Sequence, residues 1–249
     1  MEKEKSSKAM DMKISNNHIV FEVETNAGKK NVLLDTGAGG TMSFDPDVYR
    51  LTINGKSFHA FRVDLGFDPN QPNPINQLIG MEVSVFVGPD ILKTMDVLID
   101  FENNTIEFDA ARPENGSTID LGFHLGLPLL NMTVNGRELR VGFDTGAQYP
   151  FVLVDLVNEL NMGESIGQFP DFNPCREIGH FTASLYNGNI KLGECEFDDV
   201  KIAVHPKYDL SFEINGLYDV DGFLGINCLI ENKVKLWISY ANEQMVIVK

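Results

Sequence analysis

Two segments of this 249-residue sequence, VLLDTGAGG around Asp35 and VGFDTGAQ around Asp144, share the run Asp-Thr-Gly-Ala after an apolar pair. Hydrolysis of an amide requires an activated water molecule and a proton for the departing nitrogen, and two carboxyl groups that share one proton can supply both. Two such groups about 3 Å apart cannot both ionise, so they titrate in two steps that belong to the pair. Asp35 and Asp144 are the one pair of aspartates with matched flanks, and we expect them to form this dyad.

The glycines that follow the two aspartates, Gly37 and Gly146, allow a tight turn and a close approach of the two segments. Each run taken alone also fits an ordinary β-turn, which Asp and Gly favour. One Asp-Thr-Gly run arises by chance in a chain of this length with a probability on the order of a few per cent. Two runs in matched contexts therefore favour an internal duplication.

The repeat extends beyond these runs, because three later segments recur in the same order. Each pair shares its apolar positions and its turn residues, with Asn54-Gly55 and Gly193-Glu194 predicted as hairpin turns. The pairs are LTINGKSFHAFRVDL (51–65) with IKLGECEFDDVKIAV (190–204), FVGPDIL (86–92) with FLGINCL (223–229), and IDFENNTIEF (99–108) with ISYANEQMVI (238–247).

Strand-like alternation with frequent Gly, Asn and Asp turns predicts a mainly β protein. DLVNEL (155–160) is the one segment that we predict as a helix, and GFDPNQPNPINQ (66–77) is predicted as a long loop. The composition of ARPENGST (111–118) is typical of a linker between the repeats. We therefore divide the chain as follows: a charged tail (1–13), an N-terminal lobe (14–112) and a C-terminal lobe (113–249).

The two Asp-Thr-Gly runs, each followed by an apolar-apolar-Gly segment, resemble the pepsin-like aspartic peptidases over nearly the whole chain outside the tail. The apolar-apolar-Gly segments are Phe86-Val87-Gly88 and Phe223-Leu224-Gly225. Ala38 and Ala147, together with endings such as IDFENNTIEF, are more similar to the retroviral (retropepsin-like) peptidases, which are homodimers of one lobe each. The resemblance implies a single-chain, bilobal acid-protease fold, with two pseudo-twofold-related, β-barrel-like lobes and a cleft between them.

The resemblance also implies roles for the residues around the aspartates. Thr36 and Thr145 are expected to hydrogen-bond across the lobe interface, and Gly88 and Gly225 to pack beneath the dyad. Alanine at positions 38 and 147 lacks the hydroxyl that pepsin-type members place beside each carboxylate. Because one donor fewer stabilises the charged form less, we predict apparent pKa values above those of pepsin and activity from mildly acid towards neutral pH.

The spacing of the repeats places about thirty extra residues in the C-terminal lobe. Asp144 lies 109 positions after Asp35, whereas the later paired segments lie 137 to 139 positions apart. In the resembled family this interval carries the flap, so we expect one flap from the C-terminal lobe, within REIGHFTASLYNGN (176–189) and with a turn at Asn187-Gly188. The alternative is a surface insertion that does not reach the dyad. The expected flap residues are Gly179, His180, Phe181, Tyr186, Asn187 and Gly188.

Composition narrows the choice of partners. A net charge of −16 opposes binding to phosphate backbones and anionic lipids, so we expect a peptide or protein substrate, no nucleic acid and no membrane partner. The five histidines and three cysteines lack ligand spacing, so no metal and no cofactor is expected, and each histidine is assigned a structural role. The second lobe already supplies the second half of the site, so a monomer is expected. The chain as given has no signal peptide and no transmembrane segment, which predicts a cytoplasmic protein unless a leader was trimmed.

The leading functional hypothesis is an aspartic endopeptidase that activates water on the two-aspartate dyad. A second hypothesis is a catalytically silent peptide-binding or regulatory module that keeps the fold, since fold does not guarantee activity. The intact dyad, both threonines and both glycines argue against this second reading. A third, a metal site built on the aspartates, fails on ligand count because the two runs offer two carboxylates and no further acid at close spacing.

Overall fold

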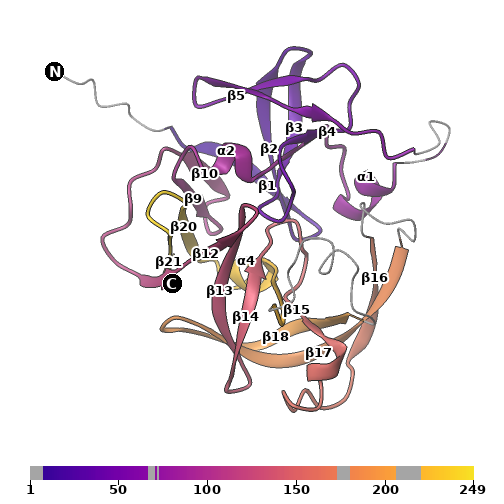
Figure 1. The fold of residues 1–249 in the computed structure, drawn as a ribbon, viewed down its shortest axis with the longest axis vertical. Coiled ribbons are helices and arrows are strands. Elements are labelled where there is room, and N and C mark those ends of the chain that lie inside the picture. Colours follow the sequence, from indigo (N-terminus) through magenta and orange to yellow (C-terminus); the bar gives the residue numbers. More distant parts are fainter. Residues whose placement is uncertain (1–7, 67–70, 72, 173–179, 206–219) are drawn as a thin grey trace.

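The chain folds into two lobes built mainly from β-strands (Figure 1). This computed structural model describes residues 8–66, 71, 73–172, 180–205 and 220–249. Its strands form two sheets, one of 13 strands and one of 8 strands. The mainly β, bilobal class expected from the sequence is thus confirmed. No helix among these residues is long and apolar enough to cross a membrane.

The first half of the chain forms the upper lobe of Figure 1, drawn in indigo to magenta. Its elements, in chain order, are β1 (Met10–Ser15), β2 (His18–Thr25), β3 (Gly28–Leu34), β4 (Met42–Ser43), β5 (Arg50–Ile53), β6 (Lys56–His59), β7 (Phe61–Arg62), α1 (Pro74–Ile79), β8 (Val85–Val87), α2 (Pro89–Leu92), β9 (Val97–Asp100) and β10 (Thr105–Phe108).

The second half repeats most of this order. Its elements are β11 (Ser117–Asp120), β12 (Gly122–His124), β13 (Leu127–Val134), β14 (Arg137–Phe143), β15 (Phe151–Leu153), the 3₁₀ turn η1 (Val154–Leu156), β16 (Gly167–Phe172), β17 (His180–Leu192), β18 (Cys195–His205), β19 (Gly222–Leu224), α4 (Asn227–Glu231), β20 (Lys235–Ser239) and β21 (Gln244–Val248).

The two lobes share the same strand pairings. In the first lobe β3 runs parallel to β8, while β4 pairs antiparallel with β8 and parallel with β7. In the second lobe β14 runs parallel to β19, while β15 pairs antiparallel with β19 and parallel with β18. The hairpins β5–β6 and β17–β18 close at the predicted turns, Asn54-Gly55 and Gly193-Glu194. The duplication read from the sequence is therefore a structural duplication.

Strands of both lobes meet in one continuous sheet with the order β11-β21-β20-β9-β10-β1. The junction is the pairing of β20 with β9, in which Lys235 lies opposite Asp100 and Ile238 opposite Val97. One apolar core also runs through both lobes. Because shared strands and a shared core fix the lobes to each other, the loops that each lobe carries are held in register.

The N-terminal tail is shorter than the sequence analysis predicts. β1 begins at Met10 and pairs with both β2 and β10, so residues 10–13 belong to the shared sheet. The alternation of this segment is the reason, because Met12 is 5% exposed while its charged neighbours face outward. The expected boundary at 112/113 falls between β10 and β11.

The predicted helix at 155–160 is wrong, and a helix forms where a loop was expected. Only the 3₁₀ turn η1 occurs at Val154–Leu156, and its N-cap residue, Leu153, makes no side-chain cap. In contrast, α1 begins within the segment 66–77, where the Asn73 side chain accepts hydrogen bonds from the amides of Ile75 and Asn76. Pro74 occupies the first turn, where it is tolerated, and Gly80 ends the helix in the left-handed conformation.

Trp237 provides a direct test of the shared sheet. It lies on β20, is 1% exposed, and its indole Nε1 donates a hydrogen bond to the Ala110 carbonyl at 3.1 Å. Trp237→Phe leaves this buried carbonyl unpaired and removes packed volume, so we expect the free energy of unfolding to fall by about 2–4 kcal/mol. Urea unfolding followed by circular dichroism measures the change. The control, Tyr49→Phe at a position 54% exposed, should change it by less than about 0.5 kcal/mol. Equal stability of Trp237→Phe and wild type would contradict this role.

Candidate active site

The two aspartates leave equivalent strands at equivalent points. Asp35 follows β3 and Asp144 follows β14. The Asp35 amide donates to the Val87 carbonyl at 3.0 Å, and the Asp144 amide donates to the Leu224 carbonyl at the same distance. These bonds continue the parallel pairings of β3 with β8 and β14 with β19. The start of each aspartate loop is therefore fixed by a buried sheet rather than by a mobile turn.

The two carboxyl groups face each other because glycine backbones leave room for them. A Cβ atom on Gly37 would overlap the carboxyl group of Asp144, and one on Gly146 would lie 2.9 Å from that of Asp35. Both aspartates are half-buried, which leaves them in contact with solvent. The structure thus brings together the pair predicted from the repeat, and it explains why each aspartate loop needs glycine at this position.

Two buried threonines lock the aspartate loops together with four hydrogen bonds. The Thr36 hydroxyl donates to the Phe143 carbonyl at 2.7 Å and accepts from the Thr145 amide at 3.0 Å. The Thr145 hydroxyl donates to the Leu34 carbonyl at 2.8 Å and accepts from the Thr36 amide at 3.0 Å. The expected cross-lobe bonding of Thr36 and Thr145 is confirmed.

Gly88 and Gly225 pack beneath the aspartate loops, as expected. A Cβ atom on Gly88 would overlap the backbone of Gly40, and one on Gly225 would overlap that of Tyr149 and lie 2.7 Å from the Ala147 carbonyl oxygen. Each loop therefore rests directly on the short strand below it. A larger residue at either position would push an aspartate out of line with its partner.

Backbone amides hold the two carboxyl groups, and burial raises the pKa of both. The Gly37 amide donates to Asp35 Oδ1 at 3.0 Å and the Gly146 amide to Asp144 Oδ1 at 2.8 Å. Burial first, and then repulsion by Asp144, raises the pKa of Asp35 well above its ordinary value. Burial also raises the pKa of Asp144, while the Gly146 amide opposes the rise. Alanine at 38 and 147 offers no side-chain hydroxyl to lower either pKa. The pair therefore holds a proton at a pH where two isolated aspartates would be ionised.

The two lobes differ beneath the dyad, in residues that the sequence analysis missed. The Thr41 hydroxyl donates to Asp90 at 2.7 Å and accepts from the Gly88 amide at 3.0 Å. Pro150 stands at the corresponding place in the second lobe, 109 positions later, and has no hydroxyl. Asn227 Oδ1, at the place of the Asp90 carboxyl, is buried without a hydrogen-bond partner in the described part of the chain. In the sequence, this difference is visible as proline at position 150 where the first repeat has Thr41.

The insertion in the second lobe forms the hairpin β16–β17, but its predicted turn is wrong. Tyr186, Asn187 and Gly188 lie within β17, opposite Ile202, Lys201 and Val200 of β18. The register shifts between Gly188 and Ile190, and a Cβ atom on Gly188 would lie 2.8 Å from Ile202 Cδ1. Asn187-Gly188 therefore marks a bulge with close packing, which carries the same residue types as a turn.

The remaining expected flap residues lie at the other end of the same strand. His180 and Phe181 begin β17, where their backbones pair with Phe172 and Asp171 of β16. Gly179 lies outside the described residues.

The hairpin β16–β17 lies beside the second aspartate loop. Phe169 on β16 makes an edge-to-face contact with Tyr149, whose ring centroid is 5.0 Å away, and Tyr149 lies five positions after Asp144. β16 also packs against α1 of the first lobe, and Figure 1 shows it rising towards that helix. The described residues of the first lobe include no such hairpin: their sheet path ends at β7, where that of the second lobe continues through β17 to β16.

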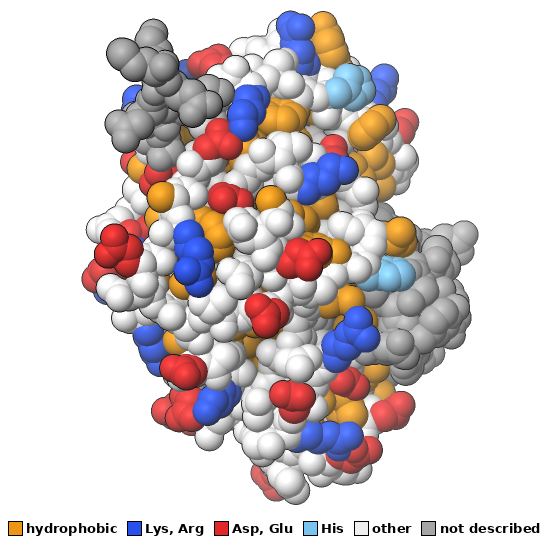
Figure 2. Space-filling view, turned by 60° about the vertical axis from the view of Figure 1, so that its left-hand side comes forward, with side chains coloured by type: hydrophobic (Ala, Val, Ile, Leu, Met, Phe, Trp, Pro, Cys, Tyr) orange, Lys and Arg blue, Asp and Glu red, His pale blue; other side chains and the backbone are white. Residues whose placement is uncertain are grey.

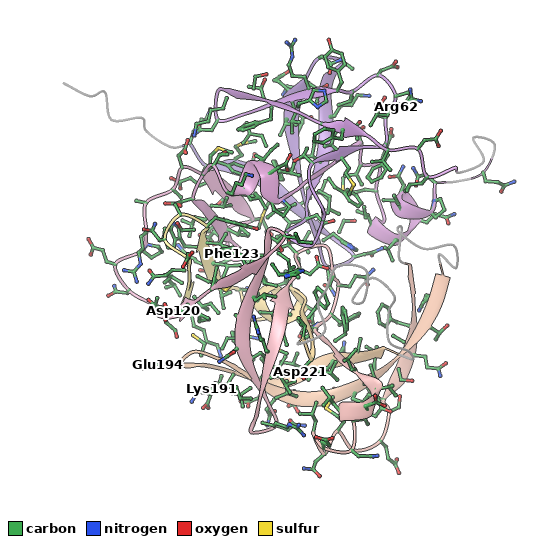
Figure 3. All side chains as sticks on the ribbon, in the orientation of Figure 1. Arg62, Asp120, Phe123, Lys191, Glu194 and Asp221 are labelled. Atoms are coloured by element: carbon green, nitrogen blue, oxygen red, sulfur yellow. The ribbon has the colours of Figure 1, made fainter. Side chains whose placement is uncertain are left out.

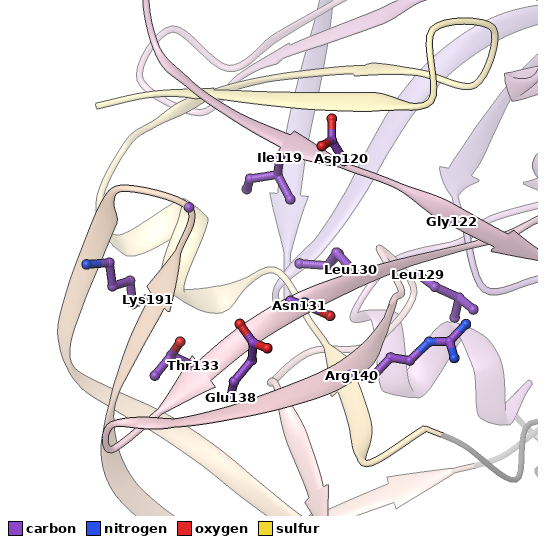
Figure 4. Close-up of a pocket in the computed structure, with 11 residues that line it drawn as sticks. Ile119, Asp120, Gly122, Leu129, Leu130, Asn131, Thr133, Glu138, Arg140 and Lys191 are labelled. Atoms are coloured by element: carbon purple, nitrogen blue, oxygen red, sulfur yellow. The ribbon is translucent and has the colours of Figure 1, made fainter.

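A separate surface pocket of about 510 Å³ lies away from the aspartate loops (Figure 4). It is lined by charged side chains of both signs, among them Asp120, Arg140 and Lys191, and by no residue of either loop. Figure 3 places Asp120, Lys191 and Glu194 along one outer edge of the second lobe, and Arg62 on the first lobe. Figure 2 shows acidic and basic side chains interspersed over one face of the molecule.

The described residues contain no cluster of three or more His, Cys, Asp or Glu that could hold a metal ion.

The fold is similar to that of a solved aspartic proteinase from Irpex lacteus. The match has a TM-score of 0.61 and 11% sequence identity, and it covers 98% of this chain and 97% of that one. At this identity the match establishes the bilobal fold alone. The sequence matches no protein-family model, and no curated protein is significantly similar to it.

The threonine lock can be tested with two variants of one residue. Thr36→Val removes a hydroxyl that both donates and accepts, so two buried backbone groups lose their partners and the free energy of unfolding should fall by about 2–4 kcal/mol. Thr36→Ser keeps the hydroxyl and should lose less than about 1 kcal/mol. Denaturant unfolding measures both. If the valine and serine variants are equally stable, the hydrogen bonds do not hold the loops together.

Proposed function

We propose that this protein is an aspartic endopeptidase of the single-chain, retropepsin-like kind. The observation that carries the proposal is the meeting of two half-buried carboxyl groups, Asp35 and Asp144, across loops interlocked by Thr36 and Thr145. Repulsion between two carboxylates makes this arrangement costly for a purely structural site. The same arrangement is required if one carboxyl group activates water while the other delivers a proton.

The proposed reaction needs no covalent intermediate. The ionised carboxylate of the pair takes a proton from a water molecule, and the resulting nucleophile attacks the carbonyl carbon of the peptide. The protonated carboxyl group hydrogen-bonds to the carbonyl oxygen, which takes up its proton in the tetrahedral intermediate. The proton taken from the water then passes to the departing nitrogen as the C–N bond breaks. A hydroxyl group of the intermediate returns its proton to the other carboxylate as the carbonyl re-forms. Asp35 and Asp144 thus exchange roles within a cycle and return to sharing one proton.

The pH range of the reaction follows from the environment of the dyad. The pKa of each aspartate is raised, chiefly by burial, and neither has a neighbouring side-chain hydroxyl at position 38 or 147 to oppose the rise. The singly protonated pair therefore persists at higher pH than in an enzyme whose carboxylates accept such bonds. We expect activity from mildly acid towards neutral pH.

The alternative is a catalytically silent module that binds peptides or regulates a partner through the same fold. Facing carboxyl groups with raised pKa values are equally compatible with such a module. This alternative predicts that the protein binds peptides without cleaving them, and that neither Asp35 nor Asp144 is individually required. Cleavage and binding must therefore be measured together.

The deciding experiment incubates a diverse peptide library with wild type, Asp35→Asn and Asp144→Asn between pH 3 and 7.5. We expect wild type to cleave, each asparagine variant to lose at least about 10³-fold in kcat/KM, and a statine-type inhibitor to block cleavage. Asp155→Asn, which changes an exposed carboxylate, is the matched control and should retain full activity. A wild type that binds peptides and cleaves none would establish the silent module. A cleavage rate that still rises as the pH is lowered to about 3 would contradict the raised pKa values.

The hairpin β16–β17 is the proposed flap of this enzyme. Its contact with Tyr149 and its packing against α1 place it between the second aspartate loop and the first lobe. A strand pair in this position can cover a bound peptide and exclude water from the dyad. A surface insertion without a role at the dyad would need neither the contact with Tyr149 nor the packing against α1.

Phe169 tests the flap without disturbing the strands that hold the core. Phe169→Ala removes the contact with Tyr149, and we expect kcat/KM to fall about tenfold with a melting temperature within about 2 °C of wild type. Ile166→Ala, a truncation at an exposed position that precedes β16, is the control and should leave kcat/KM unchanged. Full activity of Phe169→Ala would reduce the hairpin to a surface insertion.

A further inference from the structure

The strand β7 is the last strand of the first-lobe sheet, and its outer edge has no partner among the described residues. On its inner side, the Phe61 amide donates to the Thr41 carbonyl at 2.9 Å. The Val63 amide donates to the Ser43 carbonyl at the same distance. Because neighbouring residues of a strand direct their backbone groups to opposite sides, the N–H and C=O of Arg62 point outward. Figure 3 shows the Arg62 side chain directed away from the ribbon.

The second lobe shows what covers the equivalent edge there. β18 corresponds to β7, because each strand runs parallel to the short strand that follows its aspartate loop, β15 or β4. The outer partner of β18 is β17, in which Ser184 lies opposite Val204. The first half of β17 pairs with β16 and forms the proposed flap. A strand added to β7 would therefore take, in the first lobe, the place that the flap strand takes in the second.

The residues around this edge form an exposed aromatic and basic surface. Phe61 is 60% exposed, and its ring contacts that of His59 edge-to-face with 5.3 Å between the centroids. Arg50 lies opposite His59 in the hairpin β5–β6, so their side chains share a face. Tyr49, which is 54% exposed, accepts a hydrogen bond at its carbonyl from the Ala60 amide. The β7 surface is defined as Tyr49, Arg50, His59, Phe61 and Arg62.

The charge of the β7 surface is opposite to that of the whole chain. Arg50 and Arg62 are exposed, and neither guanidinium group forms an ion pair within the described residues. Lys56 on β6, in contrast, is paired with Asp109 at 2.8 Å. A net charge of −16 disfavours an acidic partner at long range, so only groups in contact can select one. Arginine suits this task because its planar group can bind a carboxylate through two hydrogen bonds.

A charged residue on an edge strand often serves only to prevent pairing with other chains. Arg62 does so for a second copy of this chain, since antiparallel pairing of two β7 strands about a twofold axis brings two like charges together. Exposed aromatic side chains do not serve that purpose, because exposed apolar area promotes association. The β7 surface therefore disfavours its own copy but suits a strand that carries acidic side chains.

We propose that the β7 surface is a docking edge for the protein chain that this enzyme cleaves, and that an extended, acidic segment of that chain adds to the sheet beside Arg62. The backbone of the segment pairs with the outward N–H and C=O of Arg62. Its carboxylates bind Arg50 and Arg62, and its apolar side chains cover Phe61. The identity of the segment as substrate rests on the proposed function. β4 directly follows the Asp35 loop and pairs with β7, so one chain can reach both the edge and the dyad.

The first test asks whether the edge is open. Amide hydrogen exchange followed by ¹⁵N NMR should find the Arg62 amide exchanging at least about tenfold faster than those of Phe61 and Val63, which are bonded to β4. A saturating peptide of alternating glutamate and valine residues should slow the exchange of the Arg62 amide at least about tenfold. If the Arg62 amide of the free protein is as protected as its neighbours, the edge is already covered and the proposal is wrong.

The second test measures the affinity of this peptide by fluorescence anisotropy and compares it with a peptide of alternating lysine and valine residues. Wild type should bind the glutamate peptide at least about tenfold more tightly than the lysine peptide, and Arg62→Glu should reverse the preference. Arg62→Ala should weaken binding of the glutamate peptide about threefold through the lost charge. Arg62→Pro should weaken it at least about tenfold, because it also removes the outward N–H while both bonds to β4 remain. The control is Arg137→Ala, an exposed arginine of the second lobe, which should change neither affinity.

Turnover gives a separate readout. For one substrate extended by either segment, we expect KM at least about fivefold lower with the glutamate–valine extension than with the lysine–valine extension, and kcat within about twofold. Arg62→Glu should abolish the difference. If wild type cleaves no peptide, the proposed function fails, while exchange and anisotropy still decide whether β7 accepts an acidic strand. Equal KM values in a wild type that cleaves both substrates would overturn the assignment of the segment to the substrate.

Three further results would overturn the docking edge. One is equal affinity of wild type for the two peptides. Another is unchanged affinity for the glutamate peptide in Arg62→Pro or, if that variant fails to fold, in Arg62→Glu. The third is a dimer in sedimentation equilibrium that Arg62→Glu abolishes, because a second copy would then be the occupant of the edge.

Discussion

The structure depends on holding two like carboxyl groups together in a partly buried place. Burial and mutual repulsion both oppose this arrangement, since each disfavours the charged form. The opposing force is the interlock of Thr36 and Thr145, four buried hydrogen bonds of roughly 1 kcal/mol each. Glycine at 37 and 146 lets the carboxyl groups approach, and the shared sheet keeps the two lobes from separating. Most features of the fold near the site serve this one contact.

Duplication gives the site its symmetry, and function then requires that the symmetry be imperfect. Two identical loops place two identical acids face to face, but acid–base chemistry needs one charged group and one neutral group. The lobes differ at Thr41 and Pro150, and in the hairpin β16–β17 that only the second lobe carries in the described part of the chain. Each difference lies in or beside an aspartate loop, while the strands that carry the loops remain equivalent.

The repeat in the sequence predicted the class of fold and the facing aspartates, and the resemblance that it carries implied the bonded threonines. These features rest on local patterns that occur twice, so each copy supports the other. Asn187-Gly188 misled the prediction because a bulge and a turn use the same residue types, and only the pairing with β18 separates them. α1 was missed because its signal is a cap, Asn73-Pro74, rather than an apolar period. The hydrogen bond of Thr41 with Asp90 joins residues distant in the chain, which no local pattern reports.

The central claim is that Asp35 and Asp144 together hold one proton in the working state. Neutron diffraction from perdeuterated crystals near pH 6 observes that proton directly. The account predicts one deuterium between the two carboxyl groups, bonded to one of them while the other is ionised, and both threonine hydroxyls donating across the lobe interface. Two ionised carboxylates, or a deuterium on each, would contradict it.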